Sequence, residues 1–369
     1  MKRISLDSLF IIGLIFILLM TCINAQSQTI RVANNNPGAT GGVNVYTGTT
    51  ALQSAINASV SGDIIHVIPG SVVHPNVTIA DKSLTILGIG LDPKKHLGQR
   101  SKATDITLNG ANSSGSRISG MHFKRLLLAN VNTPVHTVSN ILCENSDLEV
   151  VIGPGFLSNA IANIVIRNCV INGGNNTSEP QAFEIYTNSG VIITNNIIKG
   201  YCCSAGLISG DGLTIQNNLF YYSGTGGAFH SIQNCLVQNN IFLRTSGNLV
   251  GASHTGNTFI NNLSFGASDN AFANGVQGNT ATGSFVNVDP LITNVPSSGN
   301  DWVYTYNIAL LPGSPAINAG QDGTNIGPTG GSIPFDPEGT FLPLIEAINM
   351  PAVVTQGVNL EVNIKAKGN

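Results

Sequence analysis

The chain has 369 residues, of which 42% are hydrophobic and only 9% are charged, and its formal net charge is −3. The hydrophobic content excludes disorder over most of the length, because disordered chains are poor in apolar residues. The near-neutral charge balance offers no basic stripe, so we expect no binding to nucleic acid.

The first 25 residues have the layout of a secretory signal peptide. Lys2 and Arg3 precede an apolar run from Leu9 to Met20, and cleavage is expected after Ala25. The run is shorter than the about 20 residues that span a bilayer, which disfavours a membrane anchor. Lipidation of Cys22 is a further alternative. We therefore expect a secreted, periplasmic or cell-surface protein whose mature chain has no transmembrane segment.

Five cysteines remain after removal of this segment: Cys143, Cys169, Cys202, Cys203 and Cys235. The odd number and the lack of a CxxC pair argue against a structural zinc site or a full disulfide framework. We expect Cys169 and Cys235 to be small buried side chains. One disulfide remains possible in an oxidising compartment.

A short phrase that contains an Asn pair recurs every 22 residues, and the first Asn of each pair is Asn195, Asn217, Asn239 and Asn261. Looser copies lie upstream at 142–146 and 166–170. A period in the low twenties with strand-forming residues is typical of a solenoid whose repeats bury their apolar faces against one another.

Each repeat is predicted to hold three short strands. In the repeat that starts at Gly212, Leu213 and Ile215 alternate with polar residues, residues 219–222 form a second strand, and residues 228–231 begin a third. The Asn pair turns the chain, because Asn tolerates left-handed backbone angles. Coils stacked ~4.8 Å apart would align the first Asn of each pair into a hydrogen-bonded ladder. We assign these residues a structural role.

The repeat resembles that of right-handed parallel β-helices of the pectin-lyase-like superfamily. Near the start, residues 50–57 look like the amphipathic helix that caps such coils, and residues 62–70 and 82–90 look like their first strand and second coil. Near the end, residues 288–291 and 313–320 resemble the closing coils of secreted members. The resemblance implies an all-β fold, a right-handed parallel β-helix with an N-terminal capping helix. It implies less about activity, since one fold hosts unrelated functions.

The predicted organisation has three parts: a signal peptide at 1–25, the β-helix domain with its cap at 26–333, and a linker with a C-terminal β-strand tail at 334–369. Residues 334–339 read as the linker because they are rich in turn-formers. Residues 347–355 and 358–364 are strand-like and predict a short C-terminal β segment. They are too few for an independent core.

In the enzymes that the chain resembles, the substrate groove follows the outer face of the strand after the long loop. Phe183 and Phe229 occupy one column of these strands, and their bulk suggests that they face inward. Alternation then turns Glu184 and His230 outward on one stripe. The two backbones would lie two coils, or ~10 Å, apart. This pair is the candidate for general acid/base catalysis.

The catalytic set is incomplete by chemical criteria. A glycosidase needs two carboxyls, about 5 Å apart for retention or ~6.5–9.5 Å for inversion, and Glu184 has no second carboxylate on its stripe. Asp211 lies just beyond its strand and is the remaining catalytic candidate, although Asp is common in turns for backbone reasons. His254 is expected to be a turn residue.

A calcium-dependent polyuronate lyase would need several carboxylates for Ca²⁺ and an Arg or Lys base. Lys199 and Arg244 follow the Asn turns and could reach the loop side, and Tyr186 and Tyr201 are the nearest aromatic candidates for a sugar platform. These four are the candidate substrate-binding residues. Stacked Asp residues are missing between 130 and 290, so Ca²⁺ stays a possible cofactor without an assigned ligand set.

The sequence therefore predicts a secreted β-helix protein that recognises an extracellular polysaccharide. Polysaccharide lyase or glycoside hydrolase activity is one form of this hypothesis. The alternative is a non-catalytic structural or adhesive cell-surface protein, for which the stiff polar faces of a solenoid would serve as a binding surface.

Overall fold

The computed structural model describes the chain over residues 28–92, 98–129, 135–154, 159–173, 181–186, 188–200, 207–222, 227–243, 249, 254–267, 270–295, 302–337, 344–349 and 362–367. The predicted signal peptide, Cys22 included, lies outside the described residues. In the described part, no helix is both long and apolar enough to cross a membrane.

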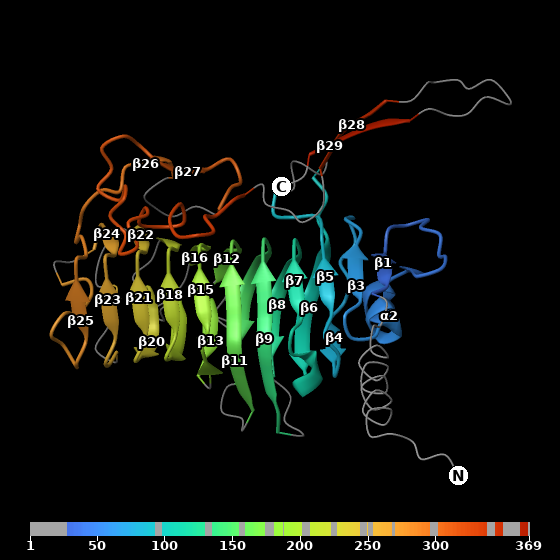
Figure 1. Ribbon diagram of the computed structural model, residues 1–369, viewed down its shortest axis with the longest axis horizontal. Helices are drawn as coiled ribbons and strands as arrows, with labels where there is room; N and C mark the ends of the chain where they lie inside the picture. The colour runs from blue at the N-terminus through green and yellow to red at the C-terminus, as the bar shows by residue number, and fades with distance from the viewer. Residues whose placement is uncertain are drawn as a thin grey trace, which may run out of the picture.

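The chain winds as a right-handed parallel β-helix, which confirms the predicted fold class (Figure 1). The first of its two large sheets contains, in spatial order, β2 (Val45–Thr47), β1 (Ile30–Asn34), β3 (Ile64–Val67), β5 (Thr85–Leu87), β7 (Arg117–Ser119), β9 (Thr137–Glu144), β11 (Ala160–Arg167), β15 (Ile192–Thr194), β18 (Thr214–Gln216), β21 (Leu236–Gln238), β23 (Thr258–Ile260) and β25 (Thr280–Thr282). The short β14 (Asn188–Ser189) pairs with β11.

The second large sheet forms the remaining sides of each coil. Its early part contains β4 (Val77–Ala80), β6 (Lys102–Asn109), β8 (His122–Leu128) and β10 (Asp147–Ile152). From β10 it divides into two branches, β12 (Val170–Gly173), β16 (Ile197–Gly200), β19 (Leu219–Tyr222), β22 (Ile241–Leu243) and β24 (Leu263–Phe265), and β13 (Phe183–Ile185), β17 (Ile208–Asp211) and β20 (Phe229–Gln233). The coil formed by β18, β19 and β20 therefore has the three strands that the repeat predicts.

The helix α2 (Ala51–Ala58) closes the N-terminal end of the coil, as predicted. It buries Ala51, Leu52, Ala55 and Ile56 in the main core. This face covers apolar side chains that an open coil end would expose to water. The only other helix in the described residues is the 3₁₀ turn η2 (Ala111–Ser113).

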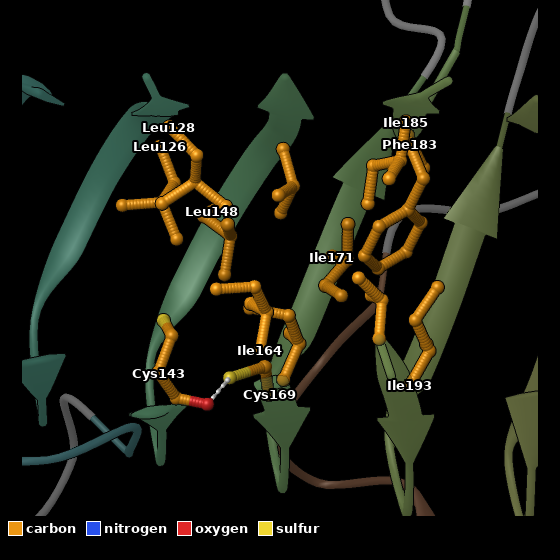
Figure 2. Packing of buried hydrophobic residues seen from close by; sticks show 14 of the residues in the cluster. Leu126, Leu128, Cys143, Leu148, Ile164, Cys169, Ile171, Phe183, Ile185 and Ile193 are labelled. Atoms are coloured by element: carbon orange, nitrogen blue, oxygen red, sulfur yellow. Dashed lines mark hydrogen bonds between the residues drawn. The ribbon is translucent and has the colours of Figure 1, made fainter. Parts of the chain in front are cut away.

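The core is a single apolar column inside the coil, built by alternate residues of each strand. Figure 2 shows Leu148, Ile171, Phe183 and Ile193 projecting into it from neighbouring strands. Further along, aromatic rings stack from coil to coil, with the ring centroids of Phe220 and Phe242 4.6 Å apart. Because each coil can bury these groups only against its neighbours, the coils stabilise one another.

The buried hydrogen-bonded ladder is formed by the second Asn of each pair, not by the first as predicted. Asn196 donates from its backbone N–H and side-chain Nδ2 to Oδ1 of Asn218. The same two bonds link Asn218 to Asn240 and Asn240 to Asn262. All four side chains are fully buried. The prediction was one residue off because the second Asn points inward, where no water can satisfy its amide.

The first Asn of each pair turns the chain, as predicted, with φ between 47° and 55° at Asn195, Asn217, Asn239 and Asn261. Their side chains point outward and bind a C-terminal segment instead of one another. Asn195 donates to the carbonyl oxygens of Pro328 and Gly330, and Asn261 donates to that of Ala319. One Asn pair thus serves two purposes, an inner ladder and an outer attachment.

That C-terminal segment, residues 302–335, runs along the outside of the coil and does not add closing coils as the resemblance suggested (Figure 1). It covers the outward apolar residues of β16, β19, β22 and β24 and forms a second apolar cluster with them. Trp302, Ala316, Ile326 and Phe335 supply its own buried side chains. Phe335, expected in a linker, is 6% exposed. We call residues 302–335 the returning segment.

Two antiparallel pairs lie outside the coil. β26 (Ile292–Asn294) pairs with β27 (Asn307–Leu310), where the returning segment begins. β28 (Leu344–Asn349) pairs with β29 (Asn363–Lys367) and gives the short C-terminal β segment that was predicted, with shifted bounds. The predicted division into three domains remains a prediction.

Cys143, Cys169 and Cys235 are buried and free, and Cys202 and Cys203 lie outside the described residues. The Cys169 thiol donates to the carbonyl oxygen of Cys143 at 3.7 Å, the dashed contact in Figure 2. Burial raises the pKa of Cys169 well above its ordinary value, and the neighbouring Cys143 thiol raises it further. Cys169 and Cys235 are therefore packed, protonated thiols rather than nucleophiles.

The ladder predicts a large difference between adjacent asparagines. Asn218→Ala removes the acceptor of Asn196 and a donor to the Ile193 carbonyl in a dry interior, at about 1–3 kcal/mol for each group left without a partner. Asn217→Gly keeps the left-handed corner (φ 52°) and removes only 3.5 Å contacts to the returning segment. We expect the urea midpoint to fall several times more in N218A. Equal shifts in the two variants would contradict the ladder.

Two buried histidines predict loss of stability in acid. His74 and His254 are each 1% exposed, and burial lowers the pKa of each to about 4, from 6.5. Unfolding therefore takes up protons between pH 6.5 and pH 4. The contribution of the two neutral histidines to the free energy of unfolding is complete above pH 6.5 and is lost as the pH falls toward 4. It amounts to at most about 3 kcal/mol per histidine.

The urea midpoint measured across this pH range tests this expectation. His74 has no hydrogen-bond partner for either ring nitrogen among the described residues, so His74→Leu should flatten the profile without leaving a buried polar group behind. An H74L profile parallel to that of the unaltered protein would assign the acid sensitivity to other groups.

Candidate functional site

The predicted catalytic stripe lies on the third strand of each coil. Phe183 and Phe229 are buried in the core, as expected, whereas Glu184 is half-buried and His230 is exposed. Glu184 and His230 thus both face outward. Their catalytic role remains a prediction.

A β-bulge shifts the two residues out of register. Glu184 pairs with Ser209, and Ser209 pairs with Ser231, so His230 is the extra residue of β20. Ser209 is fully buried, and its hydroxyl has no partner among the described residues. The straight column from Glu184 therefore continues through two serines, and His230 stands beside it. Bulges commonly re-aim a side chain in this way.

The other sequence candidates have different surroundings. Asp211 ends β17, is exposed, and accepts a 3.0 Å hydrogen bond from Asn234 in the adjacent turn. Tyr186 is 36% exposed directly after β13. Lys199, expected to reach the loop side, is only 2% exposed within β16, and its register partner Tyr221 belongs to the apolar cluster under the returning segment. Tyr201 and Arg244 lie outside the described residues.

His254, expected to be a turn residue, is buried. It lies one coil beyond Ile232, and its Nδ1 accepts a 3.1 Å hydrogen bond from the Ile232 backbone N–H. Burial lowers its pKa to about 4, and the charge of the nearby His230 adds to the effect. A neutral acceptor in this position fixes the end of β20 and thereby the strand that carries His230.

A cavity of about 650 Å³ lies on the outer face of the second sheet, over β6, β8, β10 and β12. We call it the charged pocket. Its lining includes Arg100, Lys102, His122, Lys124, Asp147, Glu149, Asn172, Trp302 and Tyr304. No sequence candidate lies among these residues.

The strand register explains why charges gather here. Lys102, His122 and Asp147 occupy one outward column, which continues into the apolar Val170 and Ile197. The apolar part of the column is covered by the returning segment. The polar part remains open, with Trp302 and Tyr304 of the returning segment at its border.

Asp147 is the hub of the charged pocket. Its Oδ2 accepts hydrogen bonds from Arg100 Nη1 at 2.8 Å and from the Tyr304 hydroxyl at 2.6 Å. Its Oδ1 accepts from Asn172 Nδ2 at 3.0 Å. The Arg100 guanidinium also lies over the Tyr304 ring, 5.3 Å from its centroid. A residue of the returning segment is thereby joined to the wall of the coil.

The electrostatics keep Asp147 ionised. Burial by itself raises the pKa of the carboxyl, but the contacts with His122, Arg100 and Tyr304 outweigh it, so the pKa lies below its ordinary value. The same burial and the Asp147 charge raise the pKa of the Tyr304 hydroxyl. Neither group exchanges a proton near neutral pH, so both act as fixed hydrogen-bonding groups.

His122 faces the charged pocket with one ring nitrogen already engaged. Its Nδ1 lies 2.8 Å from Arg100 Nη1 and 3.4 Å from Asp147 Oδ2. The side chain is 40% exposed and lines the cavity. His122 therefore keeps its second ring nitrogen, Nε2, as a hydrogen-bonding group for a ligand.

Among the described residues, no group of three or more His, Cys, Asp or Glu side chains is placed to hold a metal ion. The carboxylates that Ca²⁺ requires are not gathered in the described part of the chain.

The strands of the charged pocket share a local residue pattern, but the irregular spacing of these strands in the sequence made the pattern hard to recognise. Residues 102–104, 122–124 and 147–149 each place one apolar residue between two polar or charged ones. Their steps of 20 and 25 residues differ from the 22 of the later repeat, so the columns were not aligned. Tyr304 lies 157 residues from Asp147, a pairing that no local pattern indicates.

No protein family matches the sequence, and no curated protein matches it. Among solved structures, the crystal structure of pectate lyase Pel9A is similar, with 13% sequence identity and a TM-score of 0.41 over 82% of this chain and 96% of that chain. The parallel β-helix of the present chain rests on its own strand pairing and register.

Proposed function

We propose that the protein recognises a polysaccharide through the charged pocket, and that a polysaccharide with carboxylate groups fits it best. The observation that carries the proposal is the meeting of cations, aromatic rings and fixed hydrogen-bonding groups in one cavity of about 650 Å³. Cavities that combine apolar surface with a few convergent polar groups and shifted pKa values are the usual place for ligands.

The charge of the pocket favours an acidic ligand. Arg100, Lys102 and Lys124 stand against Asp147 and Glu149 in its lining, an excess of one positive charge before His122 is counted. Asp147 is already neutralised by Arg100 at 2.8 Å. Lys102, Lys124 and His122 line the same cavity and are the groups that would meet a carboxylate.

The pocket also suits a sugar rather than a compact ion. Trp302 and Tyr304 supply apolar surface beside the polar groups, and aromatic rings with one polar end are suited to partly wet contacts. The floor consists of parallel strands held at a fixed spacing. A stiff floor of this kind presents groups to a ligand at low entropic cost.

We further propose that the polysaccharide is cleaved at the Glu184–His230 stripe. Glu184 faces outward and His230 is exposed, which leaves both side chains available to a substrate that follows the outer face of the coil. Asp211 is the remaining catalytic candidate. We also propose that the protein is secreted or displayed at the cell surface, since acidic polysaccharides of this kind are extracellular.

Binding without turnover is the second candidate function, as in an adhesive or structural surface protein. One observation favours it for the charged pocket: the Asp147 oxygens are occupied by Arg100, Tyr304 and Asn172. A carboxylate so engaged, with its pKa lowered, serves as a fixed wall and is a poor acid or base at neutral pH.

A binding measurement tests the role of the pocket. Lys102→Gln/Lys124→Gln should weaken binding of polygalacturonate or alginate about tenfold or more, roughly 1.4 kcal/mol, because two cations that face the ligand are removed. Affinity should also fall with added salt. Lys365→Gln/Lys367→Gln in β29 makes the same charge change elsewhere and should bind like the unaltered protein.

Calorimetric titration at two salt concentrations would give these affinities. Failure of the folded protein to bind either acidic polymer would refute the proposed specificity. An equal loss of affinity in the β29 variant would show that binding depends on the net charge of the protein and not on the charged pocket.

A turnover measurement separates an enzyme from a binding protein. The same polymers are incubated with the protein, with Ca²⁺ and with a chelator, and reducing ends and the ultraviolet absorbance of unsaturated products are followed. We expect activity to be lost in Glu184→Gln and His230→Ala, with Asp211→Asn as the test of the third candidate. Binding with no product under any condition would establish the non-catalytic alternative.

A further inference from the structure

A second cavity, of about 530 Å³, lies on the outer face of the first sheet. One wall consists of β11, β15, β18 and β21, and the other consists of residues of the returning segment, including Gln321, Asp322 and Ser332. We call it the amide groove. It lies on a different sheet from the charged pocket, and the predicted catalytic stripe is not part of it.

The sheet wall repeats its polar groups once per coil. Arg167, Thr194, Gln216 and Gln238 are register partners on successive strands. The spacing is that of hydrogen-bonded strands, ~4.8 Å. Gln238 Nε2 donates to Gln216 Oε1 at 2.9 Å, and this bond aligns the two amides. A row of similar groups at one spacing matches a ligand that repeats along its length.

The opposite wall is held in place by the corner asparagines. The Gln321 backbone N–H donates to Asn239 Oδ1 at 2.9 Å, and Asn195 Nδ2 donates to the Gly330 carbonyl oxygen at 2.8 Å. Asp322 Oδ1 is engaged by the Thr324 hydroxyl at 2.8 Å. The wall is therefore fixed to the same coils whose side chains form the sheet wall.

The amide groove is polar but nearly neutral. The Arg167 guanidinium is paired with Glu144 at 2.6 Å, and Glu144 is also paired with Arg117. The remaining polar side chains of the sheet wall are amides and a hydroxyl. Amides both donate and accept hydrogen bonds, as sugar hydroxyls do. An acidic ligand would meet Asp322, and the one cation among the described lining residues, Arg167, is paired with Glu144.

We propose that the amide groove binds a neutral linear glycan, with successive sugar units lying along Thr194, Gln216 and Gln238. This site is separate from the charged pocket and does not depend on it. Its ligand class differs as well, because the one cavity collects cations and the other collects uncharged amides. Two sites of different chemistry on one stiff coil would let the protein contact a mixed polysaccharide matrix at two points.

The test uses the full mature chain and three probes, cellohexaose, xylohexaose and mannohexaose, titrated calorimetrically. Gln216→Met/Gln238→Met keeps the length of both side chains and removes their amides, and we expect at least a tenfold loss of affinity for the hexasaccharide that binds. Thr258→Val is the control, since Thr258 lies on the same face in β23, outside the groove lining. It should bind like the unaltered protein.

Two further variants make the result specific. Asp322→Asn alters the opposite wall at an exposed position and should change affinity only if the ligand touches both walls. Lys102→Gln/Lys124→Gln should leave hexasaccharide binding intact, which keeps this proposal distinct from that for the charged pocket. Equal binding by the folded double glutamine variant, or no binding of any of the three hexasaccharides, would overturn the proposal.

Discussion

The structure depends on how the Asn pairs satisfy their side-chain amides at one corner of each coil. The corner needs a left-handed residue to turn the chain and an inward polar group to satisfy the backbone of the preceding coil. Asn217 supplies the first and Asn218 the second, with its Oδ1 accepting from Asn196. An amide buried in this way must be matched by the coil above it. The 22-residue period is therefore enforced by hydrogen bonding as well as by packing.

The same corners determine where cavities form on the outer face of the coil. Their outward side chains, from Asn195 to Asn261, bind the returning segment, and the segment covers the apolar outer face of β16 to β24. The edges of the returning segment form one wall of each cavity. Trp302 and Tyr304 line the charged pocket, and Gln321 and Asp322 line the amide groove. Without this segment, the outer faces would be open sheets with exposed apolar columns. Both cavities are thus a consequence of how the coil protects its outer apolar face.

The fold could be predicted from the sequence because each of its rules is local. Alternation within 213–216, the Asn corner and the fixed period each show in a short window, and together they define a coil. The returning segment could not be predicted, since its contacts join residues such as Asn195 and Pro328 that are 133 positions apart. The inward orientation of Phe183 and Phe229 was predicted correctly. The bulge at His230 was not predicted, because no residue pattern in the sequence indicates it.

The pockets escaped prediction for a related physical reason. A polar residue on the outer face of a β-helix looks the same in sequence whether it meets water or a ligand, and only the neighbouring coils decide. Lys199 and Lys124 illustrate this: both lie in the outward column that continues through Glu149 and Asn172, yet Lys199 is buried and Lys124 lines a cavity. Tyr221, the register partner of Lys199 on the next strand, belongs to the apolar cluster under the returning segment, whereas Glu149 and Asn172 line the same cavity as Lys124. One outward column therefore passes from a cavity lining into a buried apolar cluster within a few coils.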